Sequence, residues 1–234
     1  MKAVFFDLDG TLLPMDQEVF TRGYFRELTK CVAPHGYDPK QLVDAVWKST
    51  AAMVRNDGKA SNYDVFWRTF SGIYGKKAYS DIQYFDAFYE NEFNTVKELC
   101  GHNAQAAETV RFLKSRGITL VLASNPIFPA VAQRARMRWA GIDPEDFAYI
   151  TSYENSHYCK PDPKYYSEIL SVVGLSASDC VMVGNDAVED TAAESVGISM
   201  FMLTDCLING DNRDISAYRR GGYAELKEFL TESL

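Results

Sequence analysis

Four apolar runs of the sequence lead into side chains that could act as nucleophiles, acids, bases or metal ligands. The first run, "VFFDLDGTLL" (residues 4–13), carries two aspartates and then breaks at a glycine. The polar residues that follow the four runs are Asp7, Asp9 and Thr11; Ser124 and Asn125; Lys160; and Asp186 and Asp190. Paired carboxylates, a hydroxyl group and an ammonium group together suit the transfer of a negatively charged group.

Short apolar runs alternate with amphipathic helical stretches along most of the chain. The runs span residues 3–8, 118–123, 147–152, 180–184 and 198–203. This alternation predicts an α/β fold, a Rossmann-like parallel sheet with helices on both faces. Gly117 and Gly174 are expected to end two of the helices through left-handed caps. Because ligands bind beyond the carboxyl ends of parallel strands, the polar residues should meet at one edge of the sheet.

The segment 16–95 has a different texture. It is rich in aromatic residues spaced i, i+3, i+4 and contains no clear strand. A crossover between neighbouring parallel strands needs only about a dozen residues, so the surplus predicts an inserted helical cap domain. We therefore expect a catalytic core of residues 1–15 and 96–234, with hinges near 14–16 and 96–103.

The predicted site is too acidic to hold a phosphate without a cation. Asp7, Asp9, Asp186 and Asp190 beside a phosphate dianion would repel one another strongly at low dielectric. Mg²⁺ prefers hard oxygen ligands such as carboxylates, and Lys160 would add a further positive charge. Crowding of like charges raises the pKa of one carboxylate while a cation keeps its neighbour ionised, so one acid could attack while the other donates a proton.

These motifs resemble those of the haloacid dehalogenase superfamily, in the phosphatase-like branch with a helical cap. The resemblance rests on "DLDGT" (7–11), on Ser124 after "ITLVLA", on "KPDP" (160–163) and on "GNDAVED" (184–190). It covers the whole chain, although the cap matches only in position and helical texture. It implies a Mg²⁺-dependent phosphatase that hydrolyses small phosphate monoesters through an aspartyl-phosphate.

The resemblance also implies roles for individual residues. Asp7 would be the nucleophile, and Asp9 the acid and then the base. Thr11, Ser124, Asn125 and Lys160 would bind the phosphoryl group. The carboxylates of Asp7 and Asp186 and the backbone carbonyl of Asp9 would hold Mg²⁺, with Asn185 and Asp190 behind them. Asn185 stands where some relatives have an acid that touches the metal.

In capped relatives a loop of the cap reaches over the pocket and selects the substrate. Arg55, Lys59 and Asn62 flank a turn at Gly58 and are candidates for that loop. The cap aromatics are expected to form the core of the helical bundle rather than a ligand platform. A helical cap would exclude polymers, which leaves a small phosphorylated metabolite as the partner.

Composition excludes several other classes. The net charge of −8 comes without a basic stripe, which argues against nucleic acid as a partner. No apolar stretch approaches the roughly 20 residues of a membrane helix, and no signal sequence precedes the first strand. The five cysteines are odd in number and lack C-x-x-C spacing, as expected for reduced thiols in the cytoplasm. A monomer or a homodimer is expected.

Other functions share part of this pattern. A phosphosugar mutase similar to β-phosphoglucomutase would use the same core motifs and differ in the cap. A halide-releasing enzyme is disfavoured by Asp9, because that chemistry needs no acid for the leaving group. A non-enzymatic phosphoacceptor module resembling a receiver domain would be about half as long and would take its phosphoacceptor from the third strand.

Overall fold

The computed structural model describes residues 1–234 and contains one parallel sheet of six strands. The strand order is β3-β2-β1-β4-β5-β6, and every neighbouring pair is parallel. The strands are β1 (Ala3–Phe6), β2 (Thr119–Leu122), β3 (Tyr149–Ile150), β4 (Cys180–Gly184), β5 (Ser199–Leu203) and β6 (Arg219–Gly221). The predicted Rossmann-like α/β fold is confirmed, and the short edge strand β6 is an addition.

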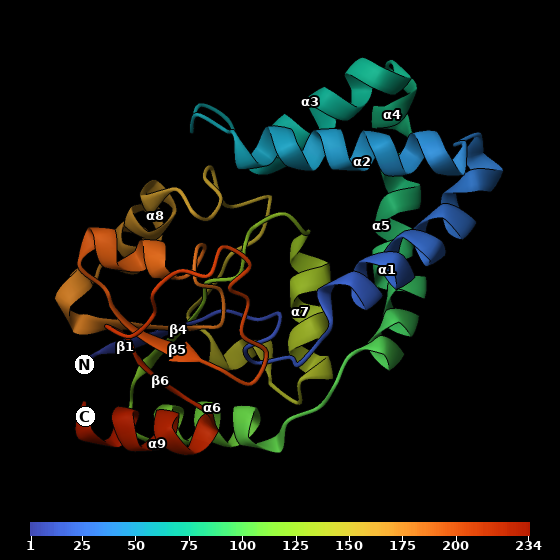
Figure 1. Cartoon of the computed structure of the whole chain (residues 1–234). Helices are drawn as coiled ribbons and strands as arrows, with labels where there is room; N and C mark the ends of the chain where they lie inside the picture. Colours follow the sequence, from blue (N-terminus) through green and yellow to red (C-terminus); the bar gives the residue numbers. More distant parts are fainter.

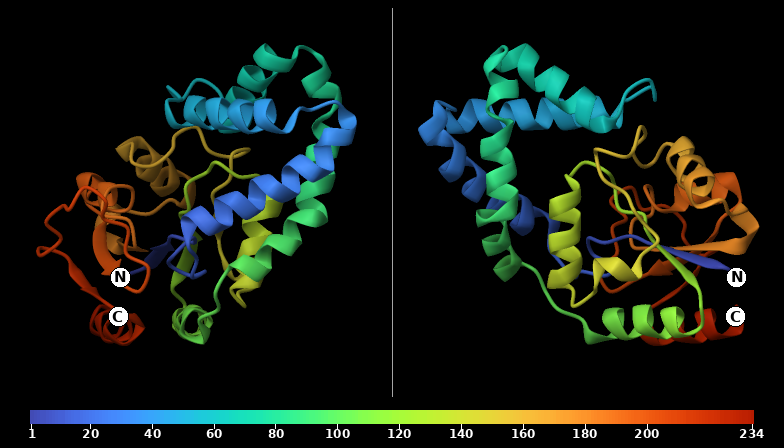
Figure 2. Two further views of the ribbon diagram at one scale, coloured as in Figure 1. Left: turned by 45° about the vertical axis from the view of Figure 1, so that its right-hand side comes forward. Right: turned by 180° about the vertical axis from the view of Figure 1, so that it is seen from behind.

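Helices cover both faces of the sheet, as Figures 1 and 2 show. On one face α6 (Ala104–Ser115) lies beside the C-terminal α9 (Tyr223–Glu232), and on the other α8 (Pro163–Val173) packs against the 3₁₀ segment η5 (Thr191–Val196). Strand β1 alternates between the two layers: Val4 and Phe6 join the larger apolar cluster, whereas Phe5 joins the smaller one. All three side chains are fully buried, which fixes the register of the central strand.

Helix ends follow the local sequence. Gly174 adopts a left-handed conformation as the C-cap of α8, and Gly117 adopts a positive φ just after α6, so both predicted stops are confirmed. Asp162 caps the N-terminus of α8 by accepting a hydrogen bond from the amide of Lys164, with Pro163 in the first turn. This cap sets the direction of the chain immediately after Lys160.

All of the regular elements between β1 and α6 are helices. They are α1 (Gln17–Val32), η1 (Ala33–His35), α2 (Pro39–Val54), α3 (Asn62–Tyr74), α4 (Lys77–Ser80), α5 (Ile82–Glu90) and η2 (Glu92–Leu99). Figures 1 and 2 show these helices to one side of the sheet, with α1 and α5 beside α7 (Ala130–Trp139) of the core. Their apolar side chains belong to the same buried cluster as one face of the sheet.

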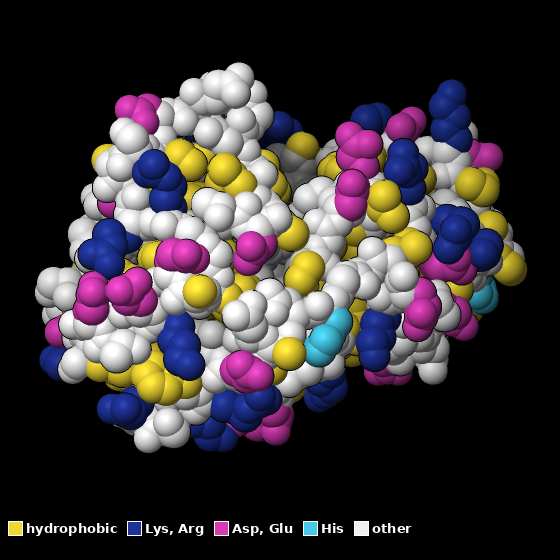
Figure 3. All heavy atoms as spheres, turned by 60° about the horizontal axis from the view of Figure 1, so that its bottom comes forward, with side chains coloured by type: hydrophobic (Ala, Val, Ile, Leu, Met, Phe, Trp, Pro, Cys, Tyr) yellow, Lys and Arg dark blue, Asp and Glu magenta, His cyan; other side chains and the backbone are white.

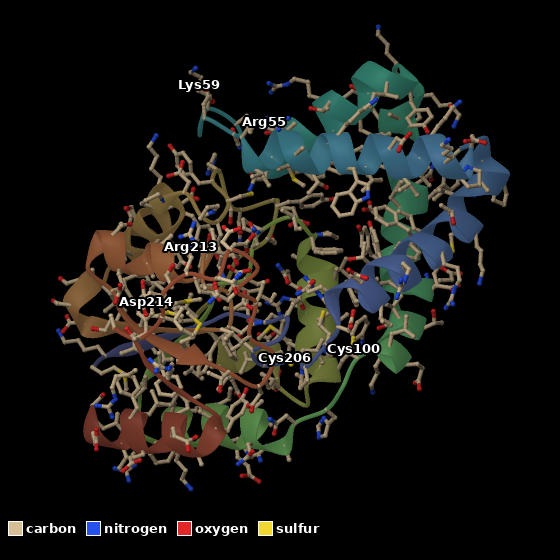
Figure 4. The ribbon with its side chains drawn as sticks, viewed as in Figure 1. Arg55, Lys59, Cys100, Cys206, Arg213 and Asp214 are labelled. Atoms are coloured by element: carbon tan, nitrogen blue, oxygen red, sulfur yellow. The ribbon has the colours of Figure 1, made fainter.

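Two linkers connect the helical segment to the sheet, and they run side by side. Met15 and Cys100 form an antiparallel bridge, and the Gly101 amide donates to the Pro14 carbonyl oxygen at 2.7 Å. Cys100 is labelled in Figure 4 and shows where the two linkers pair. Both linkers fall within the segments where the sequence predicts hinges.

A second contact joins the helical segment to the core at the N-terminus of α3, away from the two linkers. The Asn62 and Tyr63 amides donate to the carbonyl oxygens of Ser156 and Tyr153 at 2.9 and 2.6 Å. The Asn62 side chain is fully buried and accepts from Asn56 at 2.9 Å. The α3 N-terminus is therefore held against the core over the carboxyl edge of the sheet.

No helix of the structure combines the length and apolar character that crossing a membrane requires. On the face shown in Figure 3, basic and acidic side chains are interspersed and no basic stripe is seen.

Candidate active site

A polar cavity of about 190 Å³ opens beyond the carboxyl ends of β1, β2 and β4. Twelve residues line it: Asp7, Asp9, Gln17, Ser124, Asn125, Ile127, Phe128, Asn185, Asp186, Glu189, Asp190 and Ile208. Five of these are acids, so the cavity walls are strongly electronegative. The parallel register of the three strands explains why residues more than 170 positions apart in sequence meet here.

Asp7 and Asp190 are joined through Lys160. The Lys160 ammonium donates to Asp7 Oδ1 at 2.9 Å and to Asp190 Oδ1 at 2.6 Å, and its side chain is fully buried. Burial lowers the pKa of Lys160, but the carboxylates of Asp190 and Asp7 together outweigh burial and raise this pKa well above its usual value. Lys160 thus fixes one oxygen of Asp7, and no hydrogen bond reaches Asp7 Oδ2.

Burial raises the pKa of Asp7 to about 8, because the charge of Lys160 opposes the desolvation only in part and Asp190 and Asp9 add repulsion. Burial likewise raises the pKa of Glu189 to about 7. Burial and the neighbouring negative charges thus disfavour the ionised form of both carboxylates, and a bound cation would counteract this effect.

The donor set fits a small hard cation. Asp7 and Asp186 both line the cavity, and Mg²⁺ in proteins is commonly held by one or two carboxylates together with waters and phosphate oxygens. No group of three or more His, Cys, Asp or Glu side chains is arranged to chelate a metal by itself. The excess negative charge and the raised pKa of Asp7 are what a divalent cation would relieve.

The loop after β4 is organised by its own carboxylates. Asp186 Oδ1 accepts from the amides of Val188 and Glu189 at 2.7 and 2.8 Å, and Asp190 Oδ2 accepts from the Asp186 amide at 2.8 Å. A Cβ atom on Gly184 would lie 2.2 Å from Asp190 Oδ2, so only glycine leaves room for the Asp190 carboxylate. This packing positions Asp190 beside Lys160.

Thr11 and Asn185 connect the first and fourth strand loops. The Thr11 hydroxyl donates to Asn185 Oδ1 at 2.8 Å, and Asn185 Nδ2 donates to the Cys206 carbonyl oxygen at 2.7 Å (Cys206 is labelled in Figure 4). Thr11 is buried and does not line the cavity, in contrast to the phosphate-binding role that the sequence suggests. Gly10 lets the loop after β1 approach the Asn185 side chain closely, since its φ is +87° and a Cβ atom there would lie 2.3 Å from Asn185 Nδ2.

Ser124 and Asn125 lie opposite, after β2. The Ser124 carbonyl oxygen accepts from the hydroxyls of Thr151 and Tyr165 at 2.7 and 2.8 Å, which anchors the backbone while the residue lines the cavity. Asn125 Nδ2 donates to both carboxylate oxygens of Glu189 at 3.0 Å, so its amide is engaged by a residue that the sequence motifs do not indicate.

Asp9 has a partner that the sequence did not reveal. Its Oδ2 forms an ion pair with Arg136 of α7, whose side chain is fully buried and whose guanidinium lies 4.3 Å from the centre of the Phe128 ring. Asp9 Oδ1 is buried without a hydrogen-bond partner in the protein. Arg136 therefore orients Asp9 and leaves its Oδ1 without a protein partner.

The Asp9–Arg136 pair predicts an asymmetric effect on stability. Asp9→Ala should lower the free energy of unfolding by about 3 kcal/mol, because it leaves a buried guanidinium uncompensated. Arg136→Met should cost less, because Asp9 borders the cavity and water can reach it. Urea denaturation of the two variants measures the difference; a larger loss for Arg136→Met would show that packing around α7 outweighs the ion pair.

The candidate cap loop meets the core through Asn62 alone of its three predicted residues. Asn62 Nδ2 donates to the Pro126 carbonyl oxygen at 3.4 Å, next to the cavity-lining Asn125 and Ile127. Arg55 and Lys59 do not line the cavity; Lys59 lies at the tip of the loop before α3, as Figure 4 shows, and pairs with Asp57 at 2.5 Å. The one residue of the cap that lines the acidic cavity is Gln17, in the first turn of α1.

Comparison with known proteins places this geometry in context. The model of a family described as "haloacid dehalogenase-like hydrolase" matches residues 1–197. The chain is 25% identical over 195 residues to pyrophosphatase PpaX of Bacillus velezensis, covering 83% of this chain and 79% of the relative.

Solved structures share the fold across both full chains. A 2-haloacid dehalogenase from Pseudomonas syringae pv. Tomato DC3000 superimposes with a TM-score of 0.62 at 20% identity and 100% coverage of each chain. A HAD phosphatase from Thermococcus onnurineus gives 0.60 at 19% identity and 98% coverage of each chain. Similarity at this level establishes the architecture, and the chemistry must be argued from the cavity.

Proposed function

Because the chain belongs to the haloacid dehalogenase-like hydrolase family and is thus a hydrolase, we propose that it hydrolyses phosphate monoesters of small molecules with the help of Mg²⁺. The proposal rests on Asp7 and Asp9, which line one acidic cavity, and on Lys160, which is fully buried and hydrogen-bonds to Asp7 without lining the cavity itself. Asp7 Oδ2 and Asp9 Oδ1 both lack a hydrogen-bond partner in the protein.

The first step transfers the phosphoryl group to the protein. Asp7 Oδ2 attacks phosphorus, the bond between phosphorus and the ester oxygen breaks, and Asp9 Oδ1 delivers a proton to the departing alkoxide. Lys160 holds Asp7 Oδ1 and so fixes the direction of attack. The product is an aspartyl-phosphate on Asp7 and a free alcohol.

The second step returns the protein to its starting state. A water molecule attacks phosphorus, Asp9 accepts its proton, and the bond between phosphorus and Asp7 Oδ2 breaks to release inorganic phosphate. Mg²⁺, held by Asp7, Asp186 and the backbone carbonyl of Asp9, would neutralise charge on the phosphoryl oxygens. Ser124 and Lys160 would supply hydrogen bonds to the same oxygens.

Asp9 also favours phosphate ester hydrolysis over dehalogenation, which is the activity in the name of one structural neighbour. A carboxylic acid poised beside the nucleophile serves an alkoxide, which must be protonated on leaving, whereas a halide ion leaves without a proton. The ion pair with the buried Arg136 gives this carboxyl group a fixed orientation.

Metal removal tests the proposal directly. Phosphate release from a panel of monoesters should be lost after treatment with EDTA and return when Mg²⁺ is added in excess. The reason is that the acidic cavity needs a cation to offset the negative charge of its carboxylates and of the phosphate. Release measured by a colorimetric phosphate assay that persists at full rate after complete metal removal would contradict this mechanism. Conversion of a sugar phosphate to its isomer without release would favour the mutase alternative.

A further inference from the structure

A second cavity of about 190 Å³ lies beside the acidic one, between the helical cap and the core. Thirteen of the 17 residues that line it are hydrophobic, and most come from α1, α2, α3 and α5. Aromatic side chains dominate its walls: Phe20, Tyr24, Phe25, Trp47, Phe66, Trp67, Phe85, Tyr89, Phe128 and Tyr153. We call this space the aromatic cavity.

The aromatic cavity adjoins the acidic cavity at the proposed acid. Four residues line both spaces: Asp9, Gln17, Ile127 and Phe128. Asp9 is also the only charged residue of the aromatic cavity. A phosphate ester whose phosphorus faces Asp7 and whose bridging oxygen faces Asp9 would therefore direct its organic group into the aromatic cavity.

The size and polarity of the aromatic cavity restrict that organic group. An apolar cavity of about 150 Å³ is sufficient to bind benzene, so this one accommodates a single aromatic ring or a compact hydrocarbon group. No lysine or arginine lines it to receive a second phosphate or a carboxylate.

We propose that the aromatic cavity binds the leaving group of the substrate, and that the substrate class is the phosphate monoester of an alcohol carrying an aromatic ring or a group of similar size and polarity. This inference rests on the proposed phosphatase function. It distinguishes the chain from a hydrolase of inorganic pyrophosphate, because a phosphate leaving group would be placed against apolar walls with no cation.

Kinetics with matched esters test the inference. 2-Phenylethyl phosphate and ethyl phosphate share a primary alkoxide leaving group, so the chemical step is comparable and the phenyl ring is the difference. We expect kcat/KM to be about 10- to 100-fold higher for the phenylethyl ester. Equal values for the two esters, or faster hydrolysis of pyrophosphate or glucose 6-phosphate than of the phenylethyl ester, would overturn the inference.

Binding of the product alcohol provides a test that does not depend on hydrolysis. Saturation-transfer NMR should detect 2-phenylethanol on the wild-type protein, and Thr50→Trp should abolish the signal by filling the cavity that Thr50 lines. Ile73→Trp is the matched control, because Ile73 is 45% exposed on α3 and outside the cavity, and it should bind as the wild type does.

The two tests separate failure of the inference from failure of the proposed function. Phosphate release without binding of 2-phenylethanol would leave the phosphatase function intact and overturn the role of the aromatic cavity. Binding that Thr50→Trp abolishes, in a protein that releases phosphate from no ester, would support the cavity's preference and contradict the proposed hydrolysis.

Discussion

Asp7→Asn is expected to reduce the rate of phosphate release by at least about 10³-fold, because an amide oxygen cannot form the aspartyl-phosphate. The fold should persist, since the asparagine carbonyl oxygen can still accept the hydrogen bond from Lys160 and Lys160 keeps its pair with Asp190. Initial rates with a saturating ester, together with the circular dichroism spectrum, measure the two effects.

Asp214→Asn is the matched control for this variant. Asp214 lies in the exposed loop between β5 and β6, labelled in Figure 4, where its carboxylate accepts from the Ser216 amide at 2.8 Å. It should retain full activity. Equal activity of Asp7→Asn and the wild type would assign the nucleophile to another residue.

Lys160→Met should be the most destabilising single substitution in the site. It leaves the buried carboxylates of Asp7 and Asp190 without their shared cation, and loss of one partner of a buried ion pair typically costs about 3–5 kcal/mol. Activity should also fall, because Asp7 and the phosphoryl oxygens lose a donor. Guanidinium unfolding monitored by tryptophan fluorescence measures the loss.

A second substitution distinguishes repulsion from a packing defect. Lys160→Met combined with Asp190→Asn should recover part of the lost stability, because it removes one of the two uncompensated carboxylates. Lys59→Met, at the exposed end of the cap loop, should leave stability unchanged. A double variant whose loss of stability relative to the wild type equals the sum of the losses of Lys160→Met and Asp190→Asn would show that charge repulsion is not the cause.

The parts of the fold that the sequence predicts are those with strong local signals. The five apolar runs form β1 to β5, and Gly117 and Gly174 end helices, because continuous apolar runs and left-handed caps are determined over a few residues. β6 was missed because Arg219–Gly221 is short, polar and at the sheet edge. Nothing in its three residues indicates a strand without the neighbouring β5.

The site was predictable where strand ends determine it. Asp7, Ser124 and Asp186 all line one cavity, as parallel strands require. Arg136 was not predictable, because "QRARMR" (133–138) carries three arginines at alternate positions and only the packed structure shows which one is buried. Glu189 was missed for a similar reason, since its position facing Asn125 depends on how the loop after β4 turns.

The composition of the cap does not reveal whether its aromatic side chains fill a core or line a cavity. Its aromatic residues do form a buried cluster, as expected, yet many of them also line the aromatic cavity. The same side chains at the same helical spacing can fill a core or leave a space inside it, and the difference depends on interhelical distances that sequence periodicity does not encode.

Trapping the phosphorylated protein tests the formation of an aspartyl-phosphate on Asp7 most directly. Rapid quenching during turnover, followed by reduction with borohydride, converts an aspartyl-phosphate to homoserine, which peptide mass spectrometry can locate. Because Asp7 is the proposed nucleophile, we expect homoserine at position 7 in the wild type, only in the presence of substrate and Mg²⁺. Active turnover with the label at any other residue, or with no label at any residue, would contradict this assignment.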